Sequence, residues 1–484
     1  MLFNSVQYLI FLPVVVTLFW LSPRAAKMPL LLVASYIFYA TWNPPFVLLI
    51  IGLTLFNFFW GKYLSKATDE KRKQIFTWGI IANIATLAFF KYTNFLLGTV
   101  ASAVHLVTKH PTSFEANIVL PLGISFFVFE FIHYLFEVNK GGKPVDSFIH
   151  FALFAAFFPT QIAGPIKRYD DFMKQMSEYN PLKLEYFDEG LPLIITGLAK
   201  KLLFADNLAI LVQMGFSNPG AYGAPELWLF TYAFAFQIYF DFSAYTDIAR
   251  GSAMLFGYHI PINFNMPYIA ANMSDFWRRW HISLSTWLRD YLFIPMGGSR
   301  VSNWKINRNM LITFALGGLW HGASWSFVVW GLFHGMCLVV HREFVRLKER
   351  LPKLEPLWKS SAFHYFSMFL TFQAVCIGDV FFRIQDSKAA FAAVKKMVLM
   401  NPIFSAEEGH QFFIAKETLP IIVPVTVTMV AVLLLANLPL SKMIDDRAFD
   451  KVPPFMKGAF CAVLIIAMVV LIPNTSAPFV YFQF

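Results

Sequence analysis

Long apolar segments recur from one end of this 484-residue chain to the other. A helix that crosses a bilayer needs about 20 mostly apolar residues, and roughly eleven segments approach or exceed that length. They lie near 5–22, 28–42, 45–60, 76–96, 119–138, 190–215, 226–248, 310–340, 362–383, 417–436 and 457–473. Only 14% of the residues are charged, against about a quarter in soluble proteins. The sequence therefore predicts an all-α polytopic membrane protein with roughly eleven transmembrane helices, additional interfacial pieces near 146–166 and 265–297, and one domain over 1–484.

The basic loops predict an orientation. Arg24 and Lys27 follow the first apolar segment, and a run of basic residues from Lys62 to Lys73 follows the third. Because these are alternate loops, both can be cytoplasmic, which places the N-terminus outside. The net charge of +10 is explained by such loops, and no nucleic-acid partner is expected. Three widely spaced cysteines in apolar segments predict neither a disulfide framework nor a metal site.

One histidine lies in the middle of a neutral run. No Asp, Glu, Lys or Arg occurs between Asn309 and His341, a run too long for one ordinary span, so the helix is either tilted or broken at its glycines. His321 would lie about 18 Å from Asn309 along a helix with a rise of ~1.5 Å per residue, near mid-depth of the bilayer. A neutral histidine that joins two helices is the structural alternative. Burial of an ionisable group in a membrane is costly, so a functional role is favoured.

A second stretch, from Met273 to Arg300, has helical amphipathicity. Trp277 and His281 share one face of a helix that begins near Ser274, and Arg278 lies on another face. An interfacial helix with an aromatic belt would explain the tryptophans and arginines. It would not explain His281 on the aromatic face, so a catalytic or positioning role for this histidine stands beside the interfacial one.

Polar residues in three other apolar contexts are candidates for a site lining. Lys167 and Arg168 follow a segment that Pro159 and Gly164 break, and they suit either phosphate groups or ordinary positive-inside anchoring. Asp241 could orient a histidine or hold helices together, and the structural role is slightly favoured. Glu130 would contribute to a polar lining. No phosphate-loop, H-E-x-x-H or G-x-S-x-G pattern occurs, which disfavours a familiar ATP-driven pump, zinc protease or serine hydrolase.

Together, these stretches resemble the membrane-bound O-acyltransferase family, specifically its alginate O-acetylation branch. The resemblance rests on ordered segments that cover most of the chain. They are FPTQIAGPIKRY (158–169), YFDFSAYTDIARGSAMLFG (239–257), FNMPYIAANMSDFWRRWHISLSTWLRDYLFIPMGGSR (264–300), LGGLWHGASWSFVVWGLFHG (316–335), FFRIQDSKAA (381–390) and the C-terminal FVYFQF. One departure is Glu130, where family members often have Gln after Phe-x-x-Phe.

The resemblance implies a ring of transmembrane helices around a central tunnel that links a cytosolic acyl donor with an acceptor on the outer side. It implies that His321 is the catalytic residue and that His281 belongs to the same active-site region. The expected lining of the donor side and tunnel comprises Trp277, Arg279, Trp320, Lys167, Arg168, Asp241 and Glu130. The implied donor is acetyl-CoA or an acyl-carrier thioester, with no bound cofactor and no metal.

The implied function is O-acetylation of a secreted or cell-envelope polysaccharide from the bacterial cytoplasmic membrane, by relay to a periplasmic acetyltransferase. The sequence is also compatible with two alternative functions. One is transfer of D-alanine from a carrier protein towards teichoic acid. The other is a non-catalytic transporter that uses the same polar lining without covalent chemistry.

Overall fold

The structure is a computed structural model that describes residues 1–110, 113–178, 181–399, 452–471 and 478–480. Its regular elements in these ranges are helices. Within them, five helices are long and apolar enough to cross a membrane, which confirms a polytopic membrane protein. These are α3 (Pro45–Ser65), α4 (Asp69–Thr108), α14 (Trp325–Arg350), α16 (Ser361–Arg383) and α20 (Pro454–Leu471). The apolar segment predicted near 417–436 lies outside the described residues.

The chain forms two compact units, and each consists of two separate segments of the sequence. Unit 1 comprises 1–194 and 245–262, and unit 2 comprises 195–244 and 263–484. The prediction of one domain over 1–484 stays a prediction.

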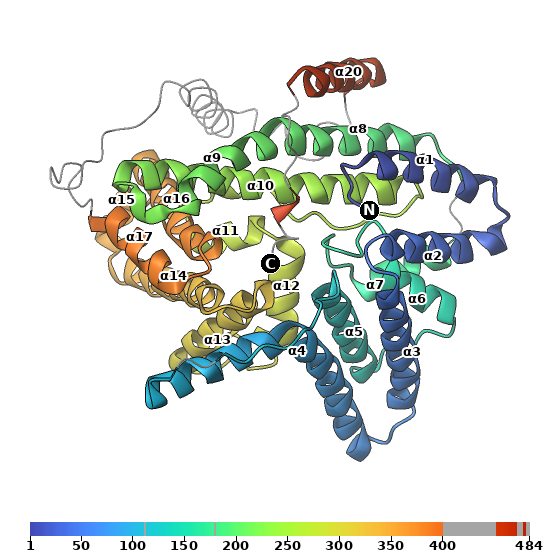
Figure 1. Ribbon diagram of the computed structural model, residues 1–484, viewed down its shortest axis with the longest axis horizontal. Coiled ribbons are helices and arrows are strands. Elements are labelled where there is room, and N and C mark those ends of the chain that lie inside the picture. Colours follow the sequence, from blue (N-terminus) through green and yellow to red (C-terminus); the bar gives the residue numbers. More distant parts are fainter. Residues whose placement is uncertain (111–112, 179–180, 400–451, 472–477, 481–484) are drawn as a thin grey trace. The chain divides into compact units, whose positions relative to one another are not determined.

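Unit 1 is a set of packed helices, of which α3 runs across the direction of α2 (Figure 1). Contacts link α2 with α3 and α6, and α3 with α4 and α5, so the unit joins sequence neighbours as well as helices distant in sequence (Figure 1). The remaining helices of the unit are α1 (Val6–Leu21), α2 (Arg24–Ala40), α5 (Ile124–Asn139), α6 (Phe148–Ala156), α7 (Tyr169–Ser177), the first part of α8 (Glu185–Ala199) and the part of α10 (Ala224–Met254) from Tyr245 onwards. Ser5 and Ser147 begin α1 and α6, because each hydroxyl accepts a hydrogen bond from the first turn of its helix.

The segment between α6 and α7 is irregular, as its prolines and glycine predict. It is nevertheless deeply buried, since Phe158, Gln161 and Lys167 are each at most 2% exposed. Gly164 packs directly against the backbone of Thr160, where a Cβ would collide. Irregular backbone of this kind is tolerated in a membrane protein where the protein itself covers it.

Unit 2 is built around a helical hairpin of α13 (Asn303–His321) and α14, which are side by side in Figure 1. The two helices approach closely because a Cβ on Gly318 would collide with the carbonyl of Phe327, and one on Gly331 with the carbonyl of Phe314. α14 packs in turn on α16 and on α17 (Ser387–Leu399). The other elements are η1 (Lys200–Ala205), α9 (Asp206–Ser217), η2 (Pro219–Ala221), α10 (Ala224–Met254, up to Ala244), η3 (Pro267–Ile269), α11 (Met273–Arg279), α12 (Ile282–Leu288), η4 (Arg289–Phe293), η5 (Pro352–Leu354) and α15 (Glu355–Trp358).

Two sequence predictions meet different outcomes in unit 2. The neutral run is broken, because α13 ends at His321 and α14 begins at Trp325. The continuous amphipathic helix expected from Met273 is wrong, since the chain leaves the helix after Arg279 and re-enters it at Ile282. A shared helical face for Trp277 and His281 therefore does not exist.

Candidate active site

His321 is the last residue of α13, and only 7% of it is exposed. Gly322 follows in extended conformation and lies against the Phe327 ring, where a Cβ would collide. The imidazole stands in an aromatic cluster, with ring centroids 5.1 Å from Trp330 and 5.2 Å from Phe382. The end of the helix thus delivers a histidine into the interior of unit 2.

His281 occupies the break between α11 and α12. Its backbone is left-handed (φ 42°, ψ 54°), a conformation that a non-glycine residue seldom adopts. Buried Asn263 holds this turn, because its carbonyl accepts from the Ile282 N–H at 3.0 Å and its side-chain oxygen accepts from the Ser283 N–H at 3.1 Å. Conformations of this kind cost about 1–3 kcal/mol and cluster at functional sites.

The two histidines belong to one cluster. Their ring centroids are 6.1 Å apart, and the Phe242 ring meets His281 edge-on at 4.7 Å. His281 is fully buried and lies outside the candidate spans, and this burial lowers the pKa of His281 to about 3. Its imidazole is therefore neutral at neutral pH, with one ring nitrogen that donates a hydrogen bond and one that accepts.

A small cavity of about 10 Å³ adjoins His321, enough for one water-sized group. Trp330, His334 and Asp379 also line it. Within the part of the chain that the structure describes, the Trp330 indole N–H, both ring nitrogens of His334 and Oδ2 of Asp379 are buried without a hydrogen-bond partner. Buried polar groups normally have one. The arrangement is therefore able to hold a small polar group, such as a hydroxyl, next to His321.

Sequence reasoning did not identify Trp330 or Asp379, and it ranked His334 below His321. A signal for Asp379 was present, since it is an acid inside the apolar segment 362–383. Its position beside the cavity depends on the packing of α16 against α14, which no local pattern specifies.

The predicted lining residues of unit 2 have different positions. Trp320 contacts both histidines, with ring centroids 5.0 Å from His321 and 6.1 Å from His281. Trp277 packs against Trp330 and His334 at 5.9 and 5.3 Å. Arg279 is partly exposed, and its Nε donates to Asp275 at 3.0 Å, so this guanidinium is already engaged by a carboxylate.

Asp241 belongs to a separate buried ion-pair network in unit 2. Lys201, on the π-helical η1, lies 2.8 Å from both Asp206 and Asp241, and all three side chains are at most 2% exposed. The second Asp241 oxygen accepts from the Val480 backbone N–H at 2.6 Å. The structural alternative for Asp241 is the one that these contacts support.

Glu130 and Lys167 form a buried pair in unit 1. The Lys167 ammonium donates to Glu130 Oε1 and to Thr160 Oγ1, both at 2.6 Å. A donor phosphate would have to compete with that carboxylate for Lys167. Arg168, at the start of α7, is partly exposed.

Comparisons with known proteins identify the family. Residues 72–378 match the model of MBOAT, the membrane-bound O-acyltransferase family. The chain is similar to a probable alginate O-acetylase of Pseudomonas aeruginosa, with 39% identity over 82% of this chain and 75% of the relative. It is also similar to a peptidoglycan O-acetyltransferase of Helicobacter pylori (35%; 83% of this chain, 81% of the relative) and to a teichoic acid D-alanyltransferase of Bacillus subtilis (30%; 69% and 85%). The family match covers more than half of the chain and includes His281, His321 and most of the cavity lining, such as Trp330 and His334; Asp379 lies just beyond its end. The chain belongs to the membrane-bound O-acyltransferase family and is an O-acyltransferase.

Proposed function

We propose that this enzyme takes acetyl groups from a cytosolic thioester, acetyl-CoA or an acyl carrier, and moves them across the bacterial inner membrane for O-acetylation of an alginate-like or other envelope polysaccharide. A periplasmic acetyltransferase that receives the acetyl group is the expected partner. Support comes from the relatives with the highest identities given above, which are named as O-acetylating proteins. A ring of helices around a central tunnel is the architecture that this transfer would require.

In the proposed step, His321 takes the proton of an acceptor hydroxyl while the oxygen attacks the thioester carbonyl carbon. The new C–O bond forms, the C–S bond breaks, and the leaving thiolate recovers the proton from the imidazolium. General-base help of this kind contributes about 10²- to 10⁴-fold. His281 would hold the reacting groups in place, and the cavity lined by Trp330 and His334 would receive the hydroxyl.

The observation that carries this proposal is the convergence of His281 and His321 in one buried cluster, next to a cavity with unsatisfied polar atoms. The two residues lie 40 positions apart in sequence, His281 in the break between α11 and α12 and His321 at the end of α13. A purely structural histidine would need one partner, whereas two histidines and a polar cavity provide the elements of acyl transfer.

The first experiment uses the full-length protein in lipid nanodiscs with radiolabelled acetyl-CoA. We expect wild type to release label from CoA and His321→Ala to be at least about 100-fold slower, because the general base is lost. His364→Ala is the matched control, since His364 is an exposed histidine of the same unit. Equal rates in wild type and His321→Ala would contradict the assignment.

Transfer of D-alanine from a carrier protein is the second candidate, favoured by the similarity to the Bacillus subtilis D-alanyltransferase. Identity and coverage are both lower for that relative than for the alginate O-acetylase. Activity with a D-alanyl carrier, in the absence of activity with acetyl-CoA, would favour this candidate. Membership in an acyltransferase family does not support the alternative of a non-catalytic transporter.

A further inference from the structure

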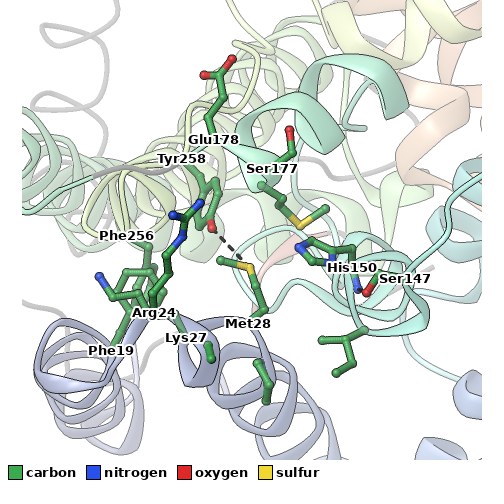
Figure 2. A pocket seen from close by; sticks show the side chains of 14 residues that line it. Phe19, Arg24, Lys27, Met28, Ser147, His150, Ser177, Glu178, Phe256 and Tyr258 are labelled. Atoms are coloured by element: carbon green, nitrogen blue, oxygen red, sulfur yellow. Dashed lines mark hydrogen bonds between the residues drawn. The ribbon is translucent and has the colours of Figure 1, made fainter.

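A second pocket, of about 660 Å³, lies wholly within unit 1 and has no part in the chemistry proposed above. Figure 2 shows its lining, which comes from the end of α1, the starts of α2 and α6, and the end of α7. The volume is typical of small-molecule sites. Exposed Arg24 and Ser177 leave it accessible from outside the protein.

The polar side of this pocket favours an anion. Arg24 and Lys27 both line it, and the first turns of α2 and α6 add the positive ends of two helix dipoles. The Nδ1 atom of His150 is buried without a hydrogen-bond partner among the residues that the structure describes. Glu178 places one negative charge at the rim, which the two cations outweigh.

Most of the remaining lining is apolar, and it lies beside exposed apolar side chains of α1. Phe19, Met28 and Phe256 line the pocket, and the Tyr258 hydroxyl donates to the Met28 sulfur at 3.5 Å. Next to Phe19 on α1, Leu18 and Leu21 are exposed apolar side chains. A ligand with a phosphate in the pocket and hydrocarbon along α1 would satisfy both surfaces.

We propose that this pocket binds the headgroup of an anionic phospholipid. Arg24 and Lys27 belong to the loop that the charge pattern predicts to be cytoplasmic, and basic pockets between membrane helices on that side recognise such headgroups. Arg24 and Lys27 contact the phosphate, His150 donates to it, and the acyl chains extend over the apolar face of α1. The site is independent of His321 and of the acyl donor.

The test is native mass spectrometry of the detergent-purified full chain titrated with dioleoylphosphatidylglycerol, with phosphatidylcholine as the neutral reference. We expect preferential binding of the anionic lipid and a loss of about five-fold in affinity for each cation removed in Arg24→Gln and Lys27→Gln. Lys27→Arg, which keeps the charge, retains binding. Lys71→Gln/Lys73→Gln is the matched control for the double variant Arg24→Gln/Lys27→Gln, since it removes the same two charges from the other predicted cytoplasmic loop.

Three outcomes would overturn the proposal. They are equal binding of the two lipids, equal weakening by the control pair, and displacement of phosphatidylglycerol by added CoA, which would assign the pocket to a thioester phosphate. Because no donor or acceptor is present, failure of acyl transfer leaves the measurement unaffected. The unfolding temperature of each variant distinguishes loss of the site from loss of the fold.

Discussion

At the scale of single residues, the backbone conformation of His281 positions its imidazole near His321. The ring centroids of His281 and His321 are 6.1 Å apart. The left-handed backbone of His281 interrupts the helix at this position. Asn263 stabilises the turn through two hydrogen bonds. The strained position is therefore expected to serve the placement of the ring.

Replacing His281 by Asn separates the ring from the turn. Asn tolerates left-handed backbone, so the fold should be kept, but the imidazole is lost. We expect the rate of acetyl release from CoA to fall by about 100-fold, with an unfolding midpoint close to that of wild type. An Asn variant with wild-type turnover would show that His281 serves only the turn.

A site residue could be predicted where the sequence shows an ionisable side chain among apolar ones, because burying such a side chain costs free energy. His321 lies in a run without charge and His281 on an aromatic stretch, and the structure brings both together. Lys201 and Asp379 also lie in apolar segments, but the pairing of Lys201 with Asp241 and the position of Asp379 beside the cavity depend on segments distant in sequence. The break at His281 was missed because Asn263, 18 positions earlier, determines it through hydrogen bonds.

At the scale of elements, the α13–α14 hairpin positions the catalytic candidate. His321 stands at its bend, and the backbones meet at Gly318 and Gly331 without space for a side chain. The sequence predicted either a tilted helix or a break at the glycines of this run, because 33 neutral residues exceed one span. It could not say that the break follows the histidine, since the stop depends on how Gly322 meets the Phe327 ring.

We expect Gly318→Ala to force the hairpin apart. Its new methyl group would collide with the Phe327 carbonyl, and overpacking of this kind costs about 1–3 kcal/mol. The measured consequences should be a lower unfolding temperature and slower acetyl release, because His321 lies one turn away. Gly98→Ala in α4 is the control: a Cβ there meets nothing within 4 Å, and alanine favours the helix. Equal unfolding temperatures and equal rates of acetyl release in the two variants would show that the close backbone approach at Gly318 is not required for stability or activity.

At the scale of the whole molecule, the apolar segments predicted the class of protein and most helix positions. The described residues contain five helices that meet the length and hydropathy of a span, fewer than the roughly eleven segments expected. Part of the difference is explained by helices such as α1, which is apolar but has only 16 residues. Hydropathy also cannot assign segments to units, because the chain passes between the units three times.

The buried network of unit 2 joins residues 239 positions apart through the Val480 N–H. Val480→Pro removes this donor and leaves an oxygen of Asp241 unsatisfied, which we expect to cost about 1.5–3 kcal/mol. Val480→Ala keeps the N–H and should cost less. Thermal unfolding of both variants, repeated with Asp241→Asn, checks this: the difference between Pro and Ala should shrink when the carboxylate is absent. A difference that persists unchanged would attribute the effect to proline geometry alone.

The same network has a consequence for biogenesis. Ribosomes add about 5–20 residues per second, so Lys201 and Asp241 emerge on the order of ten to fifty seconds before Val480. During that interval the Asp241 carboxylate lacks one of its native donors, and the nascent protein carries an incompletely neutralised charge that insertion factors or water must accommodate. The hydrogen bond between Asp241 and the Val480 N–H therefore forms late in synthesis. We expect the chain to be most susceptible to membrane proteases before it forms.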